Sequence, residues 1–366
     1  MKQTAVGAKQ QPRSKPGDLI RAAEARDVDR IRHCLQHGSS VDEKNEQGFT
    51  ALHLVSRGDD TDIIRTLIES GASVNEKDSE GETALFDAAR WDRSNAIQTL
   101  VELGVSANEK DKLGETALFP AAANDSVNAI QTLVELGVSA NEKSNTGETA
   151  LFEAACEDEV NAIRTLIDLG TLANEKDNEG KTALFEAARW DNVNAIRTLI
   201  ELGAVVNEID SSGETALRVA VREGKNDAVE ALVELKADVN HLTPEMDCPL
   251  LLAGRAGHMQ SFRALIEAGA SINVRGRDGK TPLISASRSN YFEGIQLITN
   301  VPPLQLYLEV QVKQIQSSVI KIYCESCDLK QVETFTKSSV TSVISVEQNM
   351  TLVRALPGKN NGTKID

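Results

Sequence analysis

Aromatic residues are scarce in this chain of 366 residues: they make up 4% of the sequence, with two tryptophans and three tyrosines. Such a content is low for a large globular core, because aromatic side chains normally supply much of the buried area. No apolar run approaches 18 residues, so no membrane-spanning helix is expected. The N-terminus also lacks the apolar stretch of a secretory signal. These absences favour helices lined by Ala and Leu over a core built around aromatic rings.

Cysteine and histidine are also rare, at five residues each. An odd number of cysteines in a long chain argues against a disulfide framework and predicts a reducing compartment, the cytoplasm, with the nucleus as the alternative. Cys324 and Cys327 form a lone C-x-x-C, and His33 and His37 are spaced four apart, but a structural zinc site needs four ligands. No histidine follows His258. The sequence therefore predicts no metal site and no cofactor.

What the chain does have is a repeat of 33 residues. The pattern Gly-x-Thr-Ala-Leu recurs at this spacing, with two weaker copies in register; the copies start at Gly48, Gly81, Gly114, Gly147, Gly180, Gly213, Met246 and Gly279. A fixed period of this length is the signature of a solenoid, in which each unit contacts only its neighbours.

One unit, residues 81–113, predicts two short helices and a loop. Thr83 is a candidate N-cap for the first helix, which has Leu85 in its apolar face. Asp92 interrupts that helix, since Asp favours turns and caps. A second apolar run includes Leu100 and ends at Gly104, where a left-handed residue is expected. Helices of about ten residues are unstable alone in water, so stacking must bury a shared core.

The unit resembles the ankyrin repeat. The family's T-P-L-H helix start is close to Thr50-Ala51-Leu52-His53 and to Thr281-Pro282-Leu283. A turn asparagine recurs as Asn75, Asn108, Asn141, Asn174, Asn207, Asn240 and Asn273. The family's His, which bonds between repeats, is replaced by Phe86, Phe119, Phe152 and Phe185. The resemblance implies a mainly α fold class, an ankyrin-repeat solenoid of helix-loop-helix units joined by hairpin loops, and implies junctions that depend more on aromatic packing.

Three segments are expected along the chain. Residues 1–14 are predicted to be a disordered basic arm, and residues 15–303 an array of about nine repeats, the last one truncated. Residues 304–366 form a C-terminal tail. Alternating apolar residues from Leu304 to Val312 favour a strand there, although a helical stripe fits the same segment. The tail is either a small β module or poorly ordered, and its last residues are predicted to be disordered.

Acidic residues dominate the array. The whole chain has a formal charge of −16. Residues 1–16 carry +4 and residues 304–366 carry +1, which leaves −21 for the array between them. Nucleic acid and anionic membranes both require Lys and Arg, so neither is an expected partner. The charge indicates either solubility alone or a basic protein partner.

No nucleophile motif, phosphate-binding glycine loop or opposed acid–base pair emerges, so no enzyme is predicted in residues 15–303. Runs such as residues 108–111 recur in most hairpins and are interpreted as solvated turns. The family resemblance implies a concave groove that binds proteins through the ends of the first helices and the hairpin tips. The candidate partner-binding residues are Arg57, Arg90, Trp91, Asn124, Glu157, Arg189, Trp190 and Arg222.

Arg and Trp are enriched at interaction hot spots. The alternatives are that these arginines only complement helix C-termini, and that Trp91 and Trp190 cover seams between repeats. The turn asparagines also resemble sites that an asparaginyl hydroxylase modifies in other ankyrin arrays, with Asn108 and Asn141 as candidates.

The prediction is thus a monomeric, non-catalytic scaffold or adaptor that binds other proteins in its groove. The alternative is a substrate-targeting subunit of a larger enzyme complex, such as a ubiquitin ligase, with the tail recruiting the enzyme. A catalytic tail is a third, remote reading.

Overall fold

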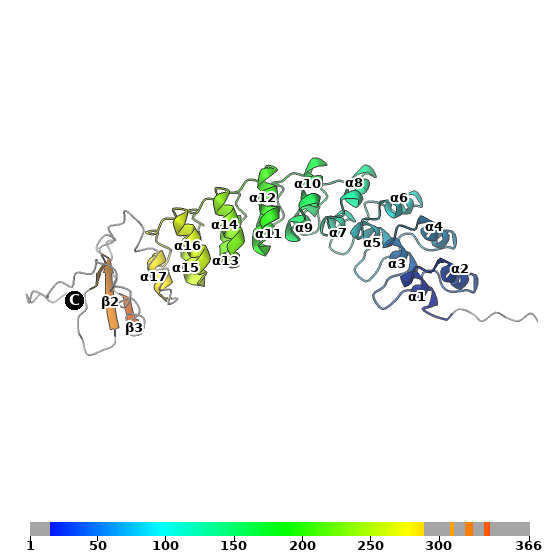
Figure 1. The fold of residues 1–366 in the computed structure, drawn as a ribbon, viewed down its shortest axis with the longest axis horizontal. Helices are drawn as coiled ribbons and strands as arrows, with labels where there is room; N and C mark the ends of the chain where they lie inside the picture. Colours follow the sequence, from blue (N-terminus) through cyan, green and yellow to red (C-terminus); the bar gives the residue numbers. More distant parts are fainter. Residues whose placement is uncertain (1–14, 289–307, 311–318, 325–332, 337–366) are drawn as a thin grey trace, which may run out of the picture. The chain divides into compact units, whose positions relative to one another are not determined.

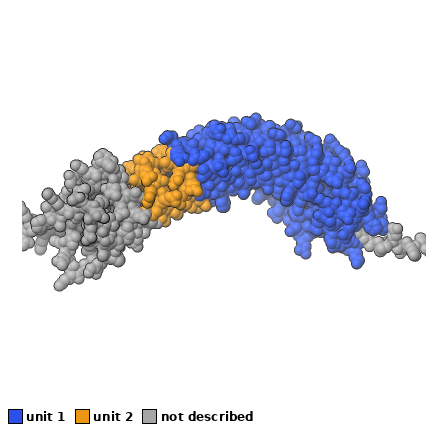
Figure 2. Space-filling view, in the orientation of Figure 1, with its two compact units in different colours: residues 1–219, 234–236 blue, residues 220–233, 237–366 orange. Residues whose placement is uncertain are grey.

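The structure is a computed structural model, and it describes residues 15–288, 308–310, 319–324 and 333–336. The described residues form seventeen α-helices and three β-strands (Figure 1). The predicted basic arm, the expected end of the array at residues 289–303 and most of the tail lie outside the described residues. The chain divides into two compact units (Figure 2): residues 1–219 with 234–236, and residues 220–233 with 237–366.

Unit 1 is a row of helix pairs, as the period predicts. The first helices of the pairs are α1 (Asp18–Glu24), α3 (Ala51–Ser56), α5 (Ala84–Arg90), α7 (Leu118–Ala122), α9 (Ala150–Cys156) and α11 (Ala183–Trp190). The second helices are α2 (Val28–Gln36), α4 (Thr61–Glu69), α6 (Ser94–Glu102), α8 (Val127–Glu135), α10 (Val160–Asp168) and α12 (Val193–Glu201). Within unit 1 the first helices lie along the hollowed side and the second helices along the opposite side (Figures 1 and 2).

The remaining helices are also short. They are α13 (Ala216–Arg222), α14 (Asn226–Glu234), α15 (Pro249–Ala256), α16 (Met259–Glu267) and α17 (Pro282–Arg288). Pro249 and Pro282 each begin a helix, where the missing backbone N–H of proline costs nothing.

Three strands form an antiparallel sheet in the order β1-β2-β3: β1 (Leu308–Val310), β2 (Val319–Cys324) and β3 (Glu333–Thr336). Glu309 pairs with Tyr323, and Lys321 pairs with Thr334. β1 lies inside the segment where alternation favoured a strand. The other Val-rich pieces, residues 339–346 and 351–356, lie outside the described residues.

The core of each repeat is built from the predicted positions. Leu85, Ala88, Ile97 and Leu100 are fully buried. The four phenylalanines at the family's His position are also buried, with 0–2% of each exposed: Phe86, Phe119, Phe152 and Phe185. They hold the repeat position from which His53 reaches the next repeat.

Helix ends follow the prediction at one terminus and depart from it at the other. Gly104 has φ 105°, a left-handed conformation that glycine adopts without strain. In the equivalent position Lys236 has φ 68°, where a side chain is disfavoured. Thr83 is the N-cap of α5, but its buried hydroxyl makes no hydrogen bond within the described residues, so the expected side-chain cap does not form.

The second helices are capped by the preceding repeat instead. The carboxylate of Asp92 accepts hydrogen bonds from the backbone N–H of Ala129 and from Asn128 Nδ2, both at 2.7 Å. Asp92 has φ 57°, and this turn aims its side chain at the next repeat. The same two hydrogen bonds recur from Asp59, Asp125 and Asp158. A carboxylate at a helix N-terminus satisfies free N–H groups and favours the helix dipole.

Candidate partner-binding surface

Two tryptophans are the largest side chains left exposed on unit 1. Trp91 is the C-cap residue of α5 and is 52% exposed, while Trp190 ends α11 and is 54% exposed. They occupy the same repeat position, three repeats apart. An indole with half its surface in water is unusual, since Trp is highly buried on average. About half of each indole surface is therefore available to a partner, and the other half lies against the protein.

Asn124 and Glu157 occupy the same repeat position in the two intervening repeats. Both are exposed. Asn124 donates to the carbonyl of Pro120 at 2.8 Å, and Glu157 is the C-cap residue of α9. The position is thus at the surface in four consecutive repeats. We define the inner-helix surface as Trp91, Asn124, Glu157 and Trp190 together with the first-helix residues beside them.

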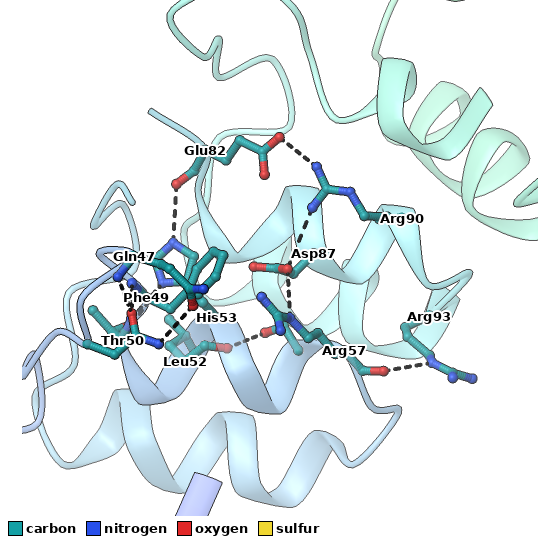
Figure 3. A network of polar contacts seen from close by, with 12 residues as sticks. Gln47, Phe49, Thr50, Leu52, His53, Arg57, Glu82, Asp87, Arg90 and Arg93 are labelled. Atoms are coloured by element: carbon teal, nitrogen blue, oxygen red, sulfur yellow. Dashed lines mark hydrogen bonds and ion pairs between the residues drawn. The ribbon is translucent and has the colours of Figure 1, made fainter. Parts of the chain in front are cut away.

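The four candidate arginines form ion pairs with carboxylates of the protein itself. Arg57 Nε donates to Asp87 Oδ1 of the next repeat at 2.9 Å, and its guanidinium lies 4.5 Å from the centroid of the Phe49 ring. Arg90 donates to Glu82 Oε1 at 2.6 Å and lies 3.6 Å from Asp87 (Figure 3). Binding a partner's carboxylate would compete with these contacts.

The other two candidate arginines also contact carboxylates of neighbouring residues. Arg189 lies 3.5 Å from Glu186, and Arg222, in unit 2, lies 3.2 Å from Glu223. The structure therefore gives all four arginines intramolecular partners, which sequence spacing alone did not indicate.

A buried polar network joins the second and third repeats (Figure 3). The ring nitrogen Nδ1 of His53 accepts from Thr50 N at 3.2 Å, so Nε2 carries the proton and donates to the carbonyl of Glu82 at 3.1 Å. This is the inter-repeat bond that the family resemblance implies. Burial raises the pKa of Asp87, an effect that the charge of Arg57 opposes.

In the fourth and fifth repeats, the carboxylates of Glu115 and Glu153 have no arginine partner within the described residues. Burial, followed by the charges of Glu153, Asp111, Glu148 and Glu82, raises the pKa of Glu115 from 4.5 to about 7. Burial and neighbouring carboxylates likewise raise the pKa of Glu153. The same influences raise the pKa of the Cys156 thiol to about 11, so this thiol stays protonated at neutral pH. The sequence pattern alone did not indicate this acidic stretch.

The hairpins are more than solvated turns, which corrects the interpretation from the sequence. Lys110 Nζ donates to the carbonyl of Lys143 at 2.9 Å and pairs with Glu142 at 2.7 Å, both in the next repeat. Equivalent contacts start from Lys44, Lys77, Lys143 and Lys176. The recurring Glu-Lys dipeptide, which the period made visible, therefore links consecutive repeats.

The two candidate hydroxylation sites differ in their contacts. Asn141 donates from Nδ2 to the carbonyl of Gly170 at 3.0 Å and accepts at Oδ1 from Leu172 N at 3.2 Å. Asn174 makes the same bridge to the following repeat. Asn108 is exposed.

In the part of the chain that the structure describes, no group of three or more His, Cys, Asp or Glu side chains is arranged to bind a metal ion. His33 and His37 stack with ring centroids 4.0 Å apart, and His37 Nδ1 lies 2.7 Å from the carbonyl of His33. Cys327 lies outside the described residues. None of the helices within them is both long and apolar enough to cross a bilayer.

Comparison with known proteins agrees with the repeat geometry. Family models described as ankyrin repeats match residues 19–111, 103–177, 169–243 and 250–298. Among solved structures, the human ASB11 ankyrin repeat domain is similar, with 26% sequence identity and a TM-score of 0.54. The match covers 61% of this chain and all of that domain. A search of curated proteins gives no match.

Proposed function

Because the chain belongs to the ankyrin-repeat family, we propose that it is a non-catalytic scaffold or adaptor that binds partner proteins through the inner-helix surface. Ankyrin repeats generally mediate protein–protein interaction, and this fold presents a row of helix ends rather than a closed catalytic cavity. The proposal is carried by one observation: the chain's only two tryptophans are both half exposed at one repeat position.

Each half-exposed indole leaves apolar surface in contact with water, and burial against a partner would remove that surface from water. Trp, Tyr and Arg dominate the hot spots of protein interfaces because they bury large areas and retain a polar group. Stacked helices are roughly 8–10 Å apart, so three repeats separate the two indoles by about 30 Å. An extended segment of about ten residues, at about 3.3 Å each, spans that distance.

The test is affinity capture from a cell lysate with the full chain, followed by mass spectrometry. The double variant Trp91→Ala/Trp190→Ala should lose the partners that the parent retains. A matched control is Leu172→Ala/Val205→Ala, which removes two exposed apolar side chains (60% and 48% exposed) that follow the second helices α10 and α12. If both double variants capture the same proteins as the parent, the inner-helix surface is not the binding site.

The targeting-subunit alternative places the recruiting element in residues 304–366. The same capture with residues 1–303 addresses it, because loss of an enzyme complex together with retention of other partners would favour that reading.

A further inference from the structure

A charge pair recurs at the first helices of two repeats. A carboxylate stands just before the N-cap residue, and an arginine eight residues later reaches back to it. In unit 1 this pair is Glu82 and Arg90, 2.6 Å apart. In unit 2, Asp247 and Arg255 form the same pair. Glu82 precedes the helix, and the long side chain of Arg90, the last residue of α5, extends back to it.

The same arginine position also reaches the following repeat. Arg57 pairs at 2.9 Å with Asp87, which stands thirty residues later on the next first helix. A guanidinium at this position therefore has two carboxylate positions within reach, one in its own repeat and one in the next. Its planar, five-donor group suits such bridging.

Ala123 occupies this position in the fourth repeat. Glu115 stands eight residues before it, and Glu153 stands thirty residues after it. Within the described part of the chain, neither carboxylate has an ion pair or a side-chain hydrogen bond. Cys156 replaces the arginine in the fifth repeat in the same way, eight residues after Glu148.

Within the described residues, the strongest charges acting on Glu115 are negative. The charges acting on it are those of Glu153, Asp111, Glu148 and Glu82, all carboxylates, and Glu82 is already paired with Arg90. Half-buried like charges raise one another's free energy, and an added cation would relieve this repulsion. Burial first, and then these neighbouring carboxylates, raise the pKa of Glu115.

The flanking repeats differ in charge. On one side Arg90 neutralises Glu82, and on the other Lys181 and Arg189 contact Glu179 and Glu186. The two unpaired first-helix carboxylates, Glu115 and Glu153, therefore lie in the two repeats between Trp91 and Trp190.

We propose that the inner-helix surface binds an extended basic segment of a partner protein, in which one Arg or Lys side chain enters beside Ala123 and bridges Glu115 and Glu153. This deepens the proposed function and rests on it. The partner's cation takes the role that Arg90 has in the preceding repeat. Trp91 and Trp190 contact the two ends of the segment, where an indole face also attracts a cation. The charge of −21 on the array increases the rate of encounter.

The test uses a phage-displayed library of random twelve-residue peptides, selected against the full chain. The selected peptides should be enriched in Arg and Lys relative to the unselected library. The tightest of them, labelled with fluorescein, is then titrated with the parent and with variants by fluorescence anisotropy.

Ala123→Arg places in the fourth repeat the residue that Arg90 and Arg189 supply in their own repeats, so the variant should fold. It should weaken the basic peptide at least tenfold, because the introduced guanidinium occupies Glu115 and Glu153. Glu115→Gln/Glu153→Gln should weaken it similarly. The control Gln131→Arg adds the same charge on the exposed face of α8, where the next repeats have Arg164 and Arg197, and should change affinity less than twofold.

Selected peptides rich in Asp or Glu, peptides without charge bias, an absence of selected peptides, or equal weakening by Ala123→Arg and Gln131→Arg would each overturn the basic-segment inference. The proposed function fails separately, when Trp91→Ala/Trp190→Ala captures the same partners as the parent. Loss of capture by the tryptophan variant, with no effect of Ala123→Arg, would retain the interaction role and reject the basic segment.

Discussion

Lys110 and Lys143 hold the same position in consecutive repeats, and the first donates from Nζ to the backbone carbonyl of the second at 2.9 Å. The lysine at this position donates from its side chain to the following repeat, and its backbone carbonyl accepts from the lysine of the preceding repeat. Five such contacts run through unit 1. They stabilise the order of the stack without adding to its apolar core.

Replacing Lys110 by Met should remove the bond to the Lys143 carbonyl and the pair with Glu142. We expect a loss of about 1 kcal/mol in the free energy of unfolding, because a surface ion pair contributes little and the carbonyl bond contributes most. Urea denaturation measures it. Lys225→Met is the control, since this ammonium makes no ion pair within the described residues. Equal stability of the two variants would contradict a stabilising role for the lysine–carbonyl contacts between repeats.

Glu115→Gln should stabilise the protein in a pH-dependent way. The pKa of Glu115 rises from 4.5 to about 7 on folding, so the parent loses stability as pH increases from about 4.5 to about 7. Above pH 7 the variant should be more stable by about 1–3 kcal/mol, allowing for solvent screening. Below pH 4.5, where the carboxyl is protonated in both states, the difference should disappear.

Glu82→Gln is the contrasting variant for the same urea series. It leaves Arg90 without its 2.6 Å partner, so it should destabilise the protein at neutral pH. A Glu115→Gln variant that is less stable than the parent at pH 8 would show that Glu115 has a stabilising partner.

The near-consensus repeats, residues 81–212, should be the most stable part of the chain. Their Asp caps and Lys contacts recur at successive junctions, and a solenoid is held by nearest-neighbour interfaces. The later repeats include the left-handed Lys236 and should open first. Amide hydrogen exchange checks this, and slower exchange in residues 246–300 than in residues 96–200 would be the contrary result.

Asn108 and Asn141 should gain one oxygen atom when the protein is treated with an asparaginyl hydroxylase. Leu103 and Leu136 stand five residues before them, as the resemblance to modified ankyrin arrays requires. Asn141 bridges to the next repeat, so we expect Asn108 to react faster. Peptide mass spectrometry measures both, and no mass gain at either residue rejects the prediction.

The sequence predicted the fold closely because the period of 33 repeats every local signal. Leu85 and Leu100 could be assigned to the core from one unit, and the other units confirm them. The contacts of Lys110 and Asp92 could not be predicted in the same way. Their partners lie 33 to 37 residues later, and only the stacked geometry brings them together.

The surface was predicted less completely. The exposed tryptophans were identified from their type and position, but Arg90 looked available because its partner Glu82 lies outside usual helical spacings. The unpaired Glu115 could have been found by comparing repeats, since Arg90 and Ala123 occupy one position. That comparison becomes meaningful only once the pairing at Glu82 is known.

The central claim, that the inner-helix surface binds partners, has a direct spectroscopic test because the only tryptophans in the chain are Trp91 and Trp190. Intrinsic fluorescence of the full chain, excited at a wavelength selective for Trp, is followed while a tryptophan-free selected peptide is titrated. Binding at this surface should produce a saturable change in emission, with a shift to shorter wavelength as the half-exposed indoles lose water, and the same Kd as anisotropy gives. Saturated binding by anisotropy with no change in tryptophan emission would contradict it.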